Sequence, residues 1–364
     1  SFKPWRMPWA APAWPLLPPG PLAEANTASG RYRAFVDHFP VTQPAYEAKV
    51  LPAFLDRFDW VLAEPSPPGF RFPGRRRCHD PASVFAVPEA LPELVRLVTE
   101  ERWRPGRRGR FAVFAASDLP LSRALGRNAE ERAHSLGVLR TFFETVFFEA
   151  LDVPLTGIQV MPIGLAEFYL ARGVASNASA AIAAASLDRK PRWALAAWNA
   201  YWRLTNPSRL QAGRFASTET ARRSGVELAT FERRSWWGEL ARYRFLLIPM
   251  GSRIQCVKMI EALLVLTVPI VHRAWYVWGF ESPDESMVHA VHDAAGADGV
   301  YAAHDGLLRL GFPLAVVDHW AEVKRGNMSR WWRTLAPRLV SFRRNCLTAE
   351  GYWSIVTGRV SRCE

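Results

Sequence analysis

The residues with the clearest chemical potential lie in one segment of the C-terminal half of this 364-residue chain. A short apolar run at residues 245–248 is bounded by Pro249 and Gly251, as expected of a parallel strand buried on both faces. Beyond the glycine, apolar residues recur at helical spacing, and a second apolar run follows at residues 268–271. A glycine turn between a strand and a helix presents backbone N–H groups and the positive end of the helix dipole to an anion. The segment therefore predicts a phosphate site, with N–H groups from Gly251 and Ser252.

The same segment carries a family resemblance. The order Phe-Leu-Leu-x-Pro-x-Gly, a basic residue three places before Glu-Ala-Leu, and then Val-Pro-Ile-Val resembles the donor-sugar segment of exostosin-like glycosyltransferases (glycosyltransferase family 47). A later run, GFPLAVVDHWAEV at residues 311–323, resembles the strand that follows in that family, and the aromatic helix after it also fits. The resemblance covers residues 190–358, with a weaker echo at residues 158–164. It implies a GT-B fold, a nucleotide-sugar donor and transfer with inversion at the anomeric carbon.

The chain departs from the family pattern at several of these positions. The family usually carries Arg-Gly-Asn-Gly after the proline, an acidic residue before the helix, an arginine on the helix and a small glycine before the second strand. Lysine in place of that arginine keeps the charge but loses the forked geometry that suits phosphate. The departures leave the expected fold intact and open the alternative of a catalytically degenerate relative. The residues that differ are Met250, Ser252, Arg253, Gln255, Lys258 and Leu266.

Several charged side chains of the segment are candidates for binding such a donor. Arg253 and Lys258 are candidate partners of the diphosphate, and surface ion pairs are the alternative. Glu261 stands among apolar residues of the helix, where a buried charge is costly unless it has a partner. The resemblance makes Glu261 the candidate for the ribose hydroxyls; a structural glutamate capped by Lys258 is the alternative. His272 and Arg273 end the second strand, at the edge where parallel sheets bind ligands, and a structural role is the alternative for both.

The later motif adds acidic candidates. Asp318 and Glu322 flank Trp320; we expect Asp318 at a strand end that faces the cleft, and Glu322 at the start of the next helix. The sequence contains no Asp-x-Asp-like pair, and GT-B transferases usually use cationic side chains and a helix dipole in place of a metal. We therefore expect a nucleotide-sugar co-substrate, with UDP as the nucleotide, and no requirement for a metal.

Inverting transfer needs a general base that deprotonates the acceptor hydroxyl as it attacks. The base should come from the N-terminal half, across the cleft from the donor. Asp118, in the loop after an expected strand at residues 111–114, is the first candidate, and an ordinary turn or N-cap aspartate is the alternative. His79 and Asp80 are the second choice.

These candidates are positioned by an alternation of strands and helices that favours parallel sheets. An alanine-rich helix at residues 176–187 is expected to join two such units. The expected strands lie at residues 59–63, 111–114, 158–161, 193–198, 244–248, 268–271 and 314–317, and the expected helices at residues 45–58, 88–101, 129–151, 218–224, 256–266 and 328–345.

We therefore expect an α/β fold of two Rossmann-like domains that face each other across a cleft, the GT-B arrangement. The chain begins at Ser1 with a segment rich in Pro, Trp and Ala, typical of a processed start or stem. The expected divisions are a Pro-rich lead or stem at residues 1–30, an acceptor domain at 31–175, a nucleotide-sugar domain at 176–346 and a C-terminal tail at 347–364.

Composition limits the possible partners. Hydrophobic residues make up 49% and charged residues 22% of the chain, as in globular proteins. The net charge of +12, with arginine clusters at residues 75–77 and 104–110, attracts polyanions. No zinc-finger or RNA-binding signature accompanies the charge, so nucleic acid is not expected and an acidic polysaccharide is a candidate partner. No apolar run reaches the roughly 18 residues that a membrane span needs.

The four cysteines contain no Cys-x-x-Cys pair that would indicate structural zinc. An oxidising compartment would permit one or two disulfides, and Cys346 and Cys363 are the two cysteines that are closest in sequence. Glycosylation sequons at Asn177 and Asn327 are also compatible with a lumenal protein. We expect the Golgi or another secretory-pathway lumen.

Three functions follow from the sequence. The first is an inverting glycosyltransferase that moves a sugar from a nucleotide-sugar donor to a hydroxyl of a glycan or glycoprotein. The second is a catalytically degenerate relative that binds glycans or assists a true transferase as a partner subunit. The third is a basic scaffold that binds polyanions through its arginine clusters.

Overall fold

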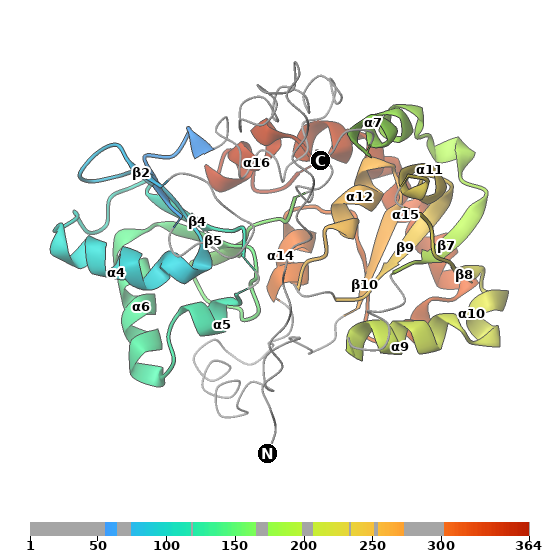
Figure 1. The fold of residues 1–364 in the computed structure, drawn as a ribbon, viewed down its shortest axis with the longest axis horizontal. Helices are drawn as coiled ribbons and strands as arrows, with labels where there is room; N and C mark the ends of the chain where they lie inside the picture. Colours follow the sequence, from blue (N-terminus) through green and yellow to red (C-terminus); the bar gives the residue numbers. More distant parts are fainter. Residues whose placement is uncertain are drawn as a thin grey trace, which may run out of the picture.

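The computed structural model describes residues 55–63, 74–117, 119–164, 174–198, 207–232, 234–250, 254–272 and 302–363. Within these ranges the chain forms two separate β-sheets, each flanked by helices (Figure 1). The expected α/β fold with two Rossmann-like domains is therefore confirmed. No helix in the described ranges is both long enough and apolar enough to cross a membrane.

The first sheet has six strands in the order β2-β1-β3-β4-β5-β6. Neighbours pair in parallel except β2, which runs antiparallel to β1 at the edge. The central strands are apolar and almost entirely buried, as expected of a parallel sheet covered on both faces. The elements are β1 (Trp60–Leu62), β2 (Arg75–Arg76), β3 (Ser83–Ala86), η2 (Pro88–Ala90), α4 (Leu91–Glu100), β4 (Phe111–Phe114), α5 (Leu121–Ala124), α6 (Ala129–Phe142), β5 (Thr145–Phe148) and β6 (Ile158–Val160).

The second sheet has five parallel strands in the order β11-β10-β9-β7-β8. Strand β9 lies at its centre, and the expected strands around residues 245, 268 and 315 are confirmed. The elements are α7 (Val174–Ala184), η4 (Leu187–Arg189), β7 (Arg192–Ala196), α9 (Pro207–Ala216), α10 (Glu219–Arg223), β8 (Val226–Leu228), α11 (Trp236–Leu240), β9 (Tyr243–Ile248), α12 (Lys258–Leu264), β10 (Val268–His272), α14 (Ala302–Arg309), β11 (Ala315–Val317), η5 (Trp320–Glu322), α15 (Arg325–Cys346) and α16 (Ala349–Val356).

One expectation for the first sheet is wrong. The helix expected at residues 129–151 ends at Phe142, and strand β5 follows it. Every residue of β5 is β-branched or aromatic, and the strand lies between β4 and β6. Pairing within the sheet therefore overrides the helical spacing of the apolar residues. The sequence patterns also do not predict β3, β8 and α9.

The C-terminal segment, expected to be a tail at residues 347–364, instead contains helix α16, which covers the first sheet (Figure 1). The Trp353 ring lies edge-on to Phe58 and Phe111, with centroid distances of 5.3 and 6.0 Å. Aromatic pairs of this geometry contribute packing as well as buried area. The end of the described chain thus completes the core of its N-terminal half.

The carboxyl edges of the two sheets meet at Gln255, just before α12. Its side chain is buried, and its Nε2 group donates to the backbone oxygens of Glu149 at 2.6 Å and Met161 at 2.8 Å. Its Oε1 atom accepts a hydrogen bond from the Ile163 amide at 2.9 Å. One side chain therefore bridges the carboxyl ends of β5 and β6 to the second domain. Helix α14 lies between the two sheets, against β6 (Figure 1).

The backbone at Leu266 explains one departure from the family pattern. Leu266 adopts a φ of 61°, in the left-handed region that favours glycine, at the position where the family has its small glycine. The left-handed conformation costs a non-glycine residue about 1–2 kcal/mol. The side chain is buried, which stabilises the fold by about 1.5–3 kcal/mol. The turn before β10 is therefore retained, and burial offsets its strain.

Candidate functional site

The carboxyl edge of the second sheet gathers the predicted donor-binding residues that the structure describes. Strand β9 ends at Ile248 and β10 at His272, and Lys258 and Glu261 lie on the intervening helix α12. Asp318 follows β11 directly. The remaining predicted residues lie outside the described ranges; they are Asp118, Gly251, Ser252, Arg253 and Arg273.

Lys258 reaches the carboxyl end of the neighbouring strand β7. Its ammonium group donates to the Ala197 carbonyl oxygen at 2.7 Å and lies 4.3 Å from the centre of the Trp236 ring. Burial lowers the pKa of Lys258, and the carboxylate of Glu261 opposes that shift. A cation therefore lies at the edge where a ligand is expected, held by a carbonyl oxygen and an aromatic face.

Glu261 is almost completely buried, with 1% of its surface exposed. Its Oε2 atom accepts a hydrogen bond from the Trp236 indole N–H at 2.5 Å. A charge-assisted bond of this kind compensates part of the cost of burying the carboxylate. Lys258, the partner considered in the structural alternative, donates to Ala197 instead. The indole provides the satisfied, buried environment that the structural alternative requires, and the predicted ribose contact stays a prediction.

His272 is the most unusual polar group at this edge. It is 94% buried, and neither ring nitrogen has a hydrogen-bond partner among the described residues. The ring lies 5.1 Å from the Trp320 ring at an interplanar angle of 34°, and the Trp320 indole N–H is also unpartnered within the described ranges. Buried polar atoms are almost always hydrogen-bonded in native proteins, so this concentration of exceptions favours a ligand.

The charge state of His272 follows from its surroundings. Burial lowers its pKa, His319 lowers it further, and the carboxylates of Asp318 and Glu322 oppose the shift. The imidazole is therefore neutral at neutral pH, with one donor and one acceptor nitrogen. It offers both kinds of hydrogen bond to a polar ligand.

The two acidic residues of the later motif have different surroundings. Glu322 Oε1 accepts hydrogen bonds from the amides of Asp318 at 2.9 Å and His319 at 2.8 Å. It lies in the short helix η5, in agreement with its predicted role at a helix start. Asp318 is exposed at the end of β11, where the sequence placed it.

Helix α9 contributes residues that the sequence analysis missed. Ser208 Oγ accepts a hydrogen bond from the Met250 amide at 3.0 Å, next to the loop that carries Gly251. Arg209 follows on the same helix; burial lowers its pKa, and interaction with Cys256 opposes that shift. The available signal was the Asn-Pro-Ser sequence at residues 206–208, because proline favours the first turn of a helix.

The carboxyl edge of the first sheet also carries polar residues that the sequence analysis missed. The Glu149 carboxylate, directly after β5, accepts a hydrogen bond from the Ala116 amide at 3.2 Å. Ala116 has a φ of 69°, a strained conformation for a residue other than glycine. Ser117 donates to the Glu89 carboxylate and accepts a hydrogen bond from the Leu119 amide. On one side of Asp118 the backbone is therefore bonded to the buried Glu149 carboxylate, and on the other side it is bonded to the Ser117 hydroxyl.

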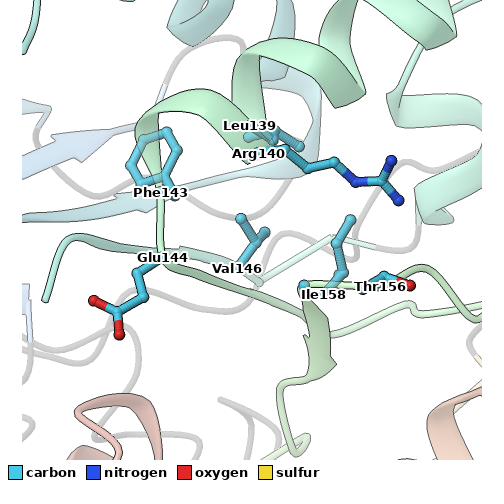
Figure 2. Close-up of a pocket in the computed structure, with 8 residues that line it drawn as sticks. Leu139, Arg140, Phe143, Glu144, Val146, Thr156 and Ile158 are labelled. Atoms are coloured by element: carbon cyan, nitrogen blue, oxygen red, sulfur yellow. The ribbon is translucent and has the colours of Figure 1, made fainter. Parts of the chain in front are cut away.

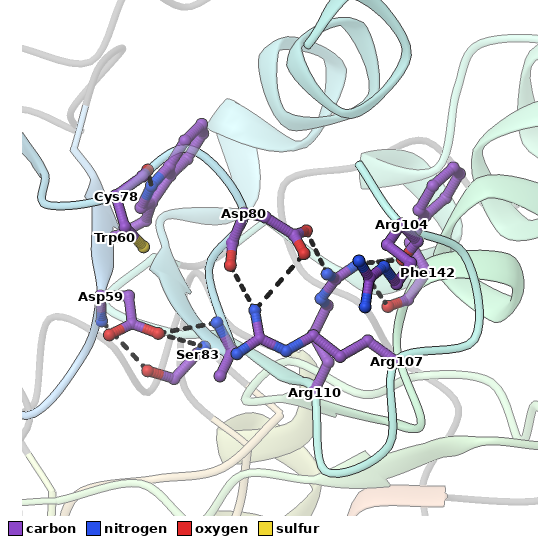
Figure 3. A network of polar contacts seen from close by, with 10 residues as sticks. Asp59, Trp60, Cys78, Asp80, Ser83, Arg104, Arg107, Arg110 and Phe142 are labelled. Carbon is purple, nitrogen blue, oxygen red and sulfur yellow. Dashed lines mark hydrogen bonds and ion pairs between the residues drawn. The ribbon is translucent and has the colours of Figure 1, made fainter. Parts of the chain in front are cut away.

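The second choice for a base, His79 or Asp80, precedes β3 and lies at the opposite edge of the strands. Figure 3 shows Asp80 with Arg107 and Arg110. Asp80 precedes β3, at the amino end of the strands, and forms ion pairs with Arg110 and Arg107. The Arg110 side chain is fully buried, so Asp80 provides the counter-charge that it needs. His79 is exposed in the same loop. Neither residue can reach a ligand at the carboxyl edge, and this expectation is wrong.

A small cavity of about 180 Å³ lies at the same amino edge (Figure 2). It is formed between the end of α6 and the starts of β5 and β6, away from the predicted residues. Its lining is mainly apolar, with one arginine and one glutamate at the rim. The lining residues are Leu139, Arg140, Phe143, Glu144, Val146, Thr156, Gly157 and Ile158.

No protein-family model matches the chain, and no curated protein matches it. Solved structures that it resembles include the spinosyn rhamnosyltransferase SpnG, with 13% identity over 94% of this chain and 80% of that one, at a TM-score of 0.30. The UDP-GlcNAc 2-epimerase from Methanocaldococcus jannaschii has 9% identity over 70% of each chain, at a TM-score of 0.27. TarM has 9% identity over 70% of this chain and 54% of that one, also at 0.27. These likenesses are too weak to carry an argument, so the fold assignment rests on the topology of the two sheets.

Proposed function

We propose that this protein is an inverting glycosyltransferase that transfers a sugar from a nucleotide-sugar donor to a hydroxyl of a glycan or glycoprotein. The observation that carries the proposal is His272, a buried imidazole at the carboxyl edge of a parallel sheet with no hydrogen-bond partner among the described residues. Ligands of open α/β sheets bind at this edge. The motif order that resembles exostosin-like glycosyltransferases places the donor segment at the same edge.

In this proposal the donor lies against the second sheet. Gly251 and Ser252 supply backbone N–H groups to the diphosphate, and Arg253 and Lys258 supply positive charge. The partly buried cation Arg209 adds to that charge from the start of α9. Positive side chains at this edge neutralise the leaving nucleoside diphosphate, which is the task that a metal ion performs in other transferases.

The remaining donor contacts come from the outer strands and from α12. The neutral imidazole of His272 donates one hydrogen bond and accepts another. Arg273 and Asp318 complete the edge, and Glu261 accepts hydrogen bonds from the ribose hydroxyls. UDP is the proposed nucleotide because the resemblance implies it.

The acceptor approaches from the first sheet. Asp118 removes the proton of the acceptor hydroxyl while the oxygen attacks the anomeric carbon, and the bond from that carbon to the diphosphate oxygen breaks. The proton stays on Asp118, and the electron pair leaves with the nucleoside diphosphate. The ties from Glu149 to Ala116 and from Glu89 to Ser117 would hold this loop in position. The resemblance also places the reaction in a secretory-pathway lumen such as the Golgi.

Two contacts favour a second candidate function, a degenerate relative that binds glycans without turnover. The Trp236 indole occupies an oxygen of Glu261, and the Ala197 carbonyl occupies the ammonium of Lys258. Each contact uses part of the hydrogen-bonding capacity that a donor would need. Release of nucleoside diphosphate in the presence of donor and acceptor separates the two functions.

Donor binding provides the first test. UDP and a panel of UDP-sugars are titrated calorimetrically into the wild type, His272→Phe and His134→Ala. His134 is exposed on α6 and serves as the matched control. Loss of a hydrogen bond from a buried site should weaken binding by about tenfold or more in His272→Phe and leave His134→Ala unchanged. If no nucleotide or nucleotide sugar binds, or if His272→Phe binds as tightly as the wild type, the proposed donor site is wrong.

The base is tested separately. Asp118→Asn should retain donor affinity and lose turnover by about 10²-fold or more. An unchanged rate would assign Asp118 to the structural alternative, a turn residue.

A further inference from the structure

A pair of arginines shares one tryptophan at the amino edge of the second sheet. The Cζ atom of Arg325 lies 3.7 Å from the centre of the Trp193 ring, and that of Arg244 lies 4.4 Å from the same centre. Arg244 is also 5.6 Å from the centre of the Trp332 ring. Trp193 and Arg244 are the second residues of β7 and β9, so this group lies at the opposite end of the strands from His272.

Neither arginine forms an ion pair within the described part of the chain. Neighbouring arginines are paired: Arg192 lies 3.1 Å from Glu227, and Arg242 lies 3.1 Å from Glu239. Arg244 donates its Nε–H to a backbone oxygen, which leaves its terminal nitrogens free of protein partners in the described ranges. Within the described ranges, no carboxylate pairs with either of these two positive charges.

The two guanidinium groups repel each other. Burial lowers the pKa of Arg325, and the positive charge of Arg244 lowers it further. Arg325 is also the first residue of α15, a helix with no acidic residue in its first turn and no side chain that caps it. Positive side chains are disfavoured at this end of a helix because the dipole is positive there. A sequence that breaks local electrostatic rules at one place marks a candidate functional site.

The backbone provides space for this arrangement at Gly225. The glycine has a φ of 87°, and a Cβ added to it would lie 2.9 Å from Arg325 Nη1 and 3.1 Å from the Trp193 Cβ. A side chain at position 225 would therefore press on the guanidinium group. The glycine keeps Arg325 against the indole.

From this arrangement we infer that Arg244, Arg325 and Trp193 form a binding site for a tetrahedral oxyanion, the phosphate or sulfate group of a ligand outside the donor site. A guanidinium group that stacks flat on an aromatic ring directs its N–H donors outward, in the plane of the group. A tetrahedral dianion has enough oxygens to accept from two such groups and enough charge to relieve their repulsion. A carboxylate matches one guanidinium fork but leaves the second positive charge uncompensated.

Two probes distinguish the sources of the oxyanion. Inorganic phosphate represents a free ion, and dextran sulfate represents a sulfated polymer. Both are titrated into the full chain at low and high ionic strength, with Trp fluorescence and calorimetry as readouts. The variants are Arg244→Gln, Arg325→Gln, Arg325→Lys and Gly225→Ala. The control is Arg140→Gln, which removes from the first domain an arginine that is exposed, as Arg325 is, and that has no ion pair in the described ranges.

Binding of either probe should weaken by about tenfold or more in Arg244→Gln and Arg325→Gln, because each loses charge-assisted hydrogen bonds. Arg325→Lys and Gly225→Ala keep the charge and should still weaken binding, because the first loses the fork and the second displaces it. Arg140→Gln should bind as the wild type does, apart from the small effect of one net charge. Binding of phosphate assigns the site to a free ion; binding of dextran sulfate alone assigns it to a polymer.

Three results would overturn the inference. One is that neither probe binds. Another is that the control weakens binding as much as the Arg244 and Arg325 variants, because attraction would then be a property of the net charge. The third is wild-type affinity in both Arg325→Lys and Gly225→Ala, because the geometry would then be irrelevant. Urea midpoints of each variant separate loss of binding from loss of fold.

Discussion

Replacing Gln255 with glutamate should separate the role of its shape from the role of its donors. The amide group of Gln255 donates two hydrogen bonds to backbone oxygens and accepts one. In Gln255→Glu the acceptor oxygen remains, whereas the one nitrogen that donates both hydrogen bonds becomes an oxygen atom that faces two carbonyl oxygens. The side chain is buried, so water cannot replace the lost partners. The exostosin-like pattern commonly has an acidic residue at this place, so the substitution also tests what that departure contributes.

The expected loss of unfolding free energy depends on whether the new carboxyl group is charged or protonated in the folded protein. A charged carboxylate would leave two buried carbonyl groups unpaired, at about 1–3 kcal/mol each, in addition to the cost of burying its charge. Protonation restores one donor, but neutralising a group of ordinary pKa about 4.3 at about pH 7 costs about 3.7 kcal/mol. The protonated form gives the lower total, about 3.7 kcal/mol plus about 1–3 kcal/mol for the carbonyl that stays unpaired, so we place the destabilisation at about 5–7 kcal/mol near neutral pH. Because folding raises the pKa of this new acid, stability should recover as the pH falls towards about 4.3.

Urea unfolding followed by tryptophan fluorescence at several pH values measures this cost. Gln255→Met is the matched control, because it loses all three hydrogen bonds and carries no charge. The free energy of unfolding that Gln255→Met loses relative to the wild type should be the same at every pH. The loss in Gln255→Glu should become smaller as the pH falls. A Gln255→Glu variant within about 0.5 kcal/mol of the wild type would refute the reasoning, since that is the range of ordinary surface substitutions. So would a cost that does not depend on pH.

Two further predictions concern buried groups outside the proposed site. Lys190 Nζ is surrounded by the oxygens of Ala241, Tyr243, Val265 and Thr267, and burial lowers its pKa from 10.5 to about 7. Between these values the unfolded chain binds more protons, so this residue should make the unfolding free energy rise with pH by up to about 1.4 kcal/mol per unit. Urea titrations should show this slope in the wild type and not in Lys190→Met; parallel pH profiles would contradict it. The thiols of Cys346 and Cys363 are hydrogen-bonded to each other, which raises the pKa of Cys346 and lowers that of Cys363. Oxidised glutathione should therefore convert both thiols to one intramolecular disulfide, release two molecules of reduced glutathione, and stabilise the fold by about 3 kcal/mol. Thiol counting and mass spectrometry with Cys346→Ser as the control check this, and an unchanged thiol count in the wild type would contradict it.

The sequence predicts the elements that have one strong local signal. Strands β4, β9 and β10 are short apolar runs bounded by turn residues, and the structure places each within a residue or two of the expected range. Strand β5 fails because its apolar residues satisfy a helical period equally well, and only its neighbours in the sheet decide between the two. The spacing of apolar residues therefore identifies a helix or a strand when it fits only one of the two periods. It does not do so when it fits both.

The candidate site is less predictable because its contacts join distant parts of the chain. The indole that occupies Glu261 comes from Trp236, and the loop of Ala116 is held by Glu149. Asp80 looked like a free acid in the sequence, yet it compensates a buried arginine on the wrong edge of the sheet. The residue type indicates which chemistry a side chain can perform. The fold decides which partner forms a hydrogen bond or an ion pair with it.

The return of α16 to the first sheet has a consequence for biosynthesis. The first domain emerges from the ribosome long before residues 349–356 are synthesised. Domains generally begin to fold as they emerge. Until then Phe58 and Phe111 lack the cover that Trp353 provides. The nascent N-terminal domain therefore exposes aromatic surface during synthesis of the whole second domain, which favours chaperone binding and, in its absence, aggregation. A stop codon at position 349, which removes α16 and the residues after it, should accordingly reduce the soluble yield of a protein whose two sheets are otherwise complete.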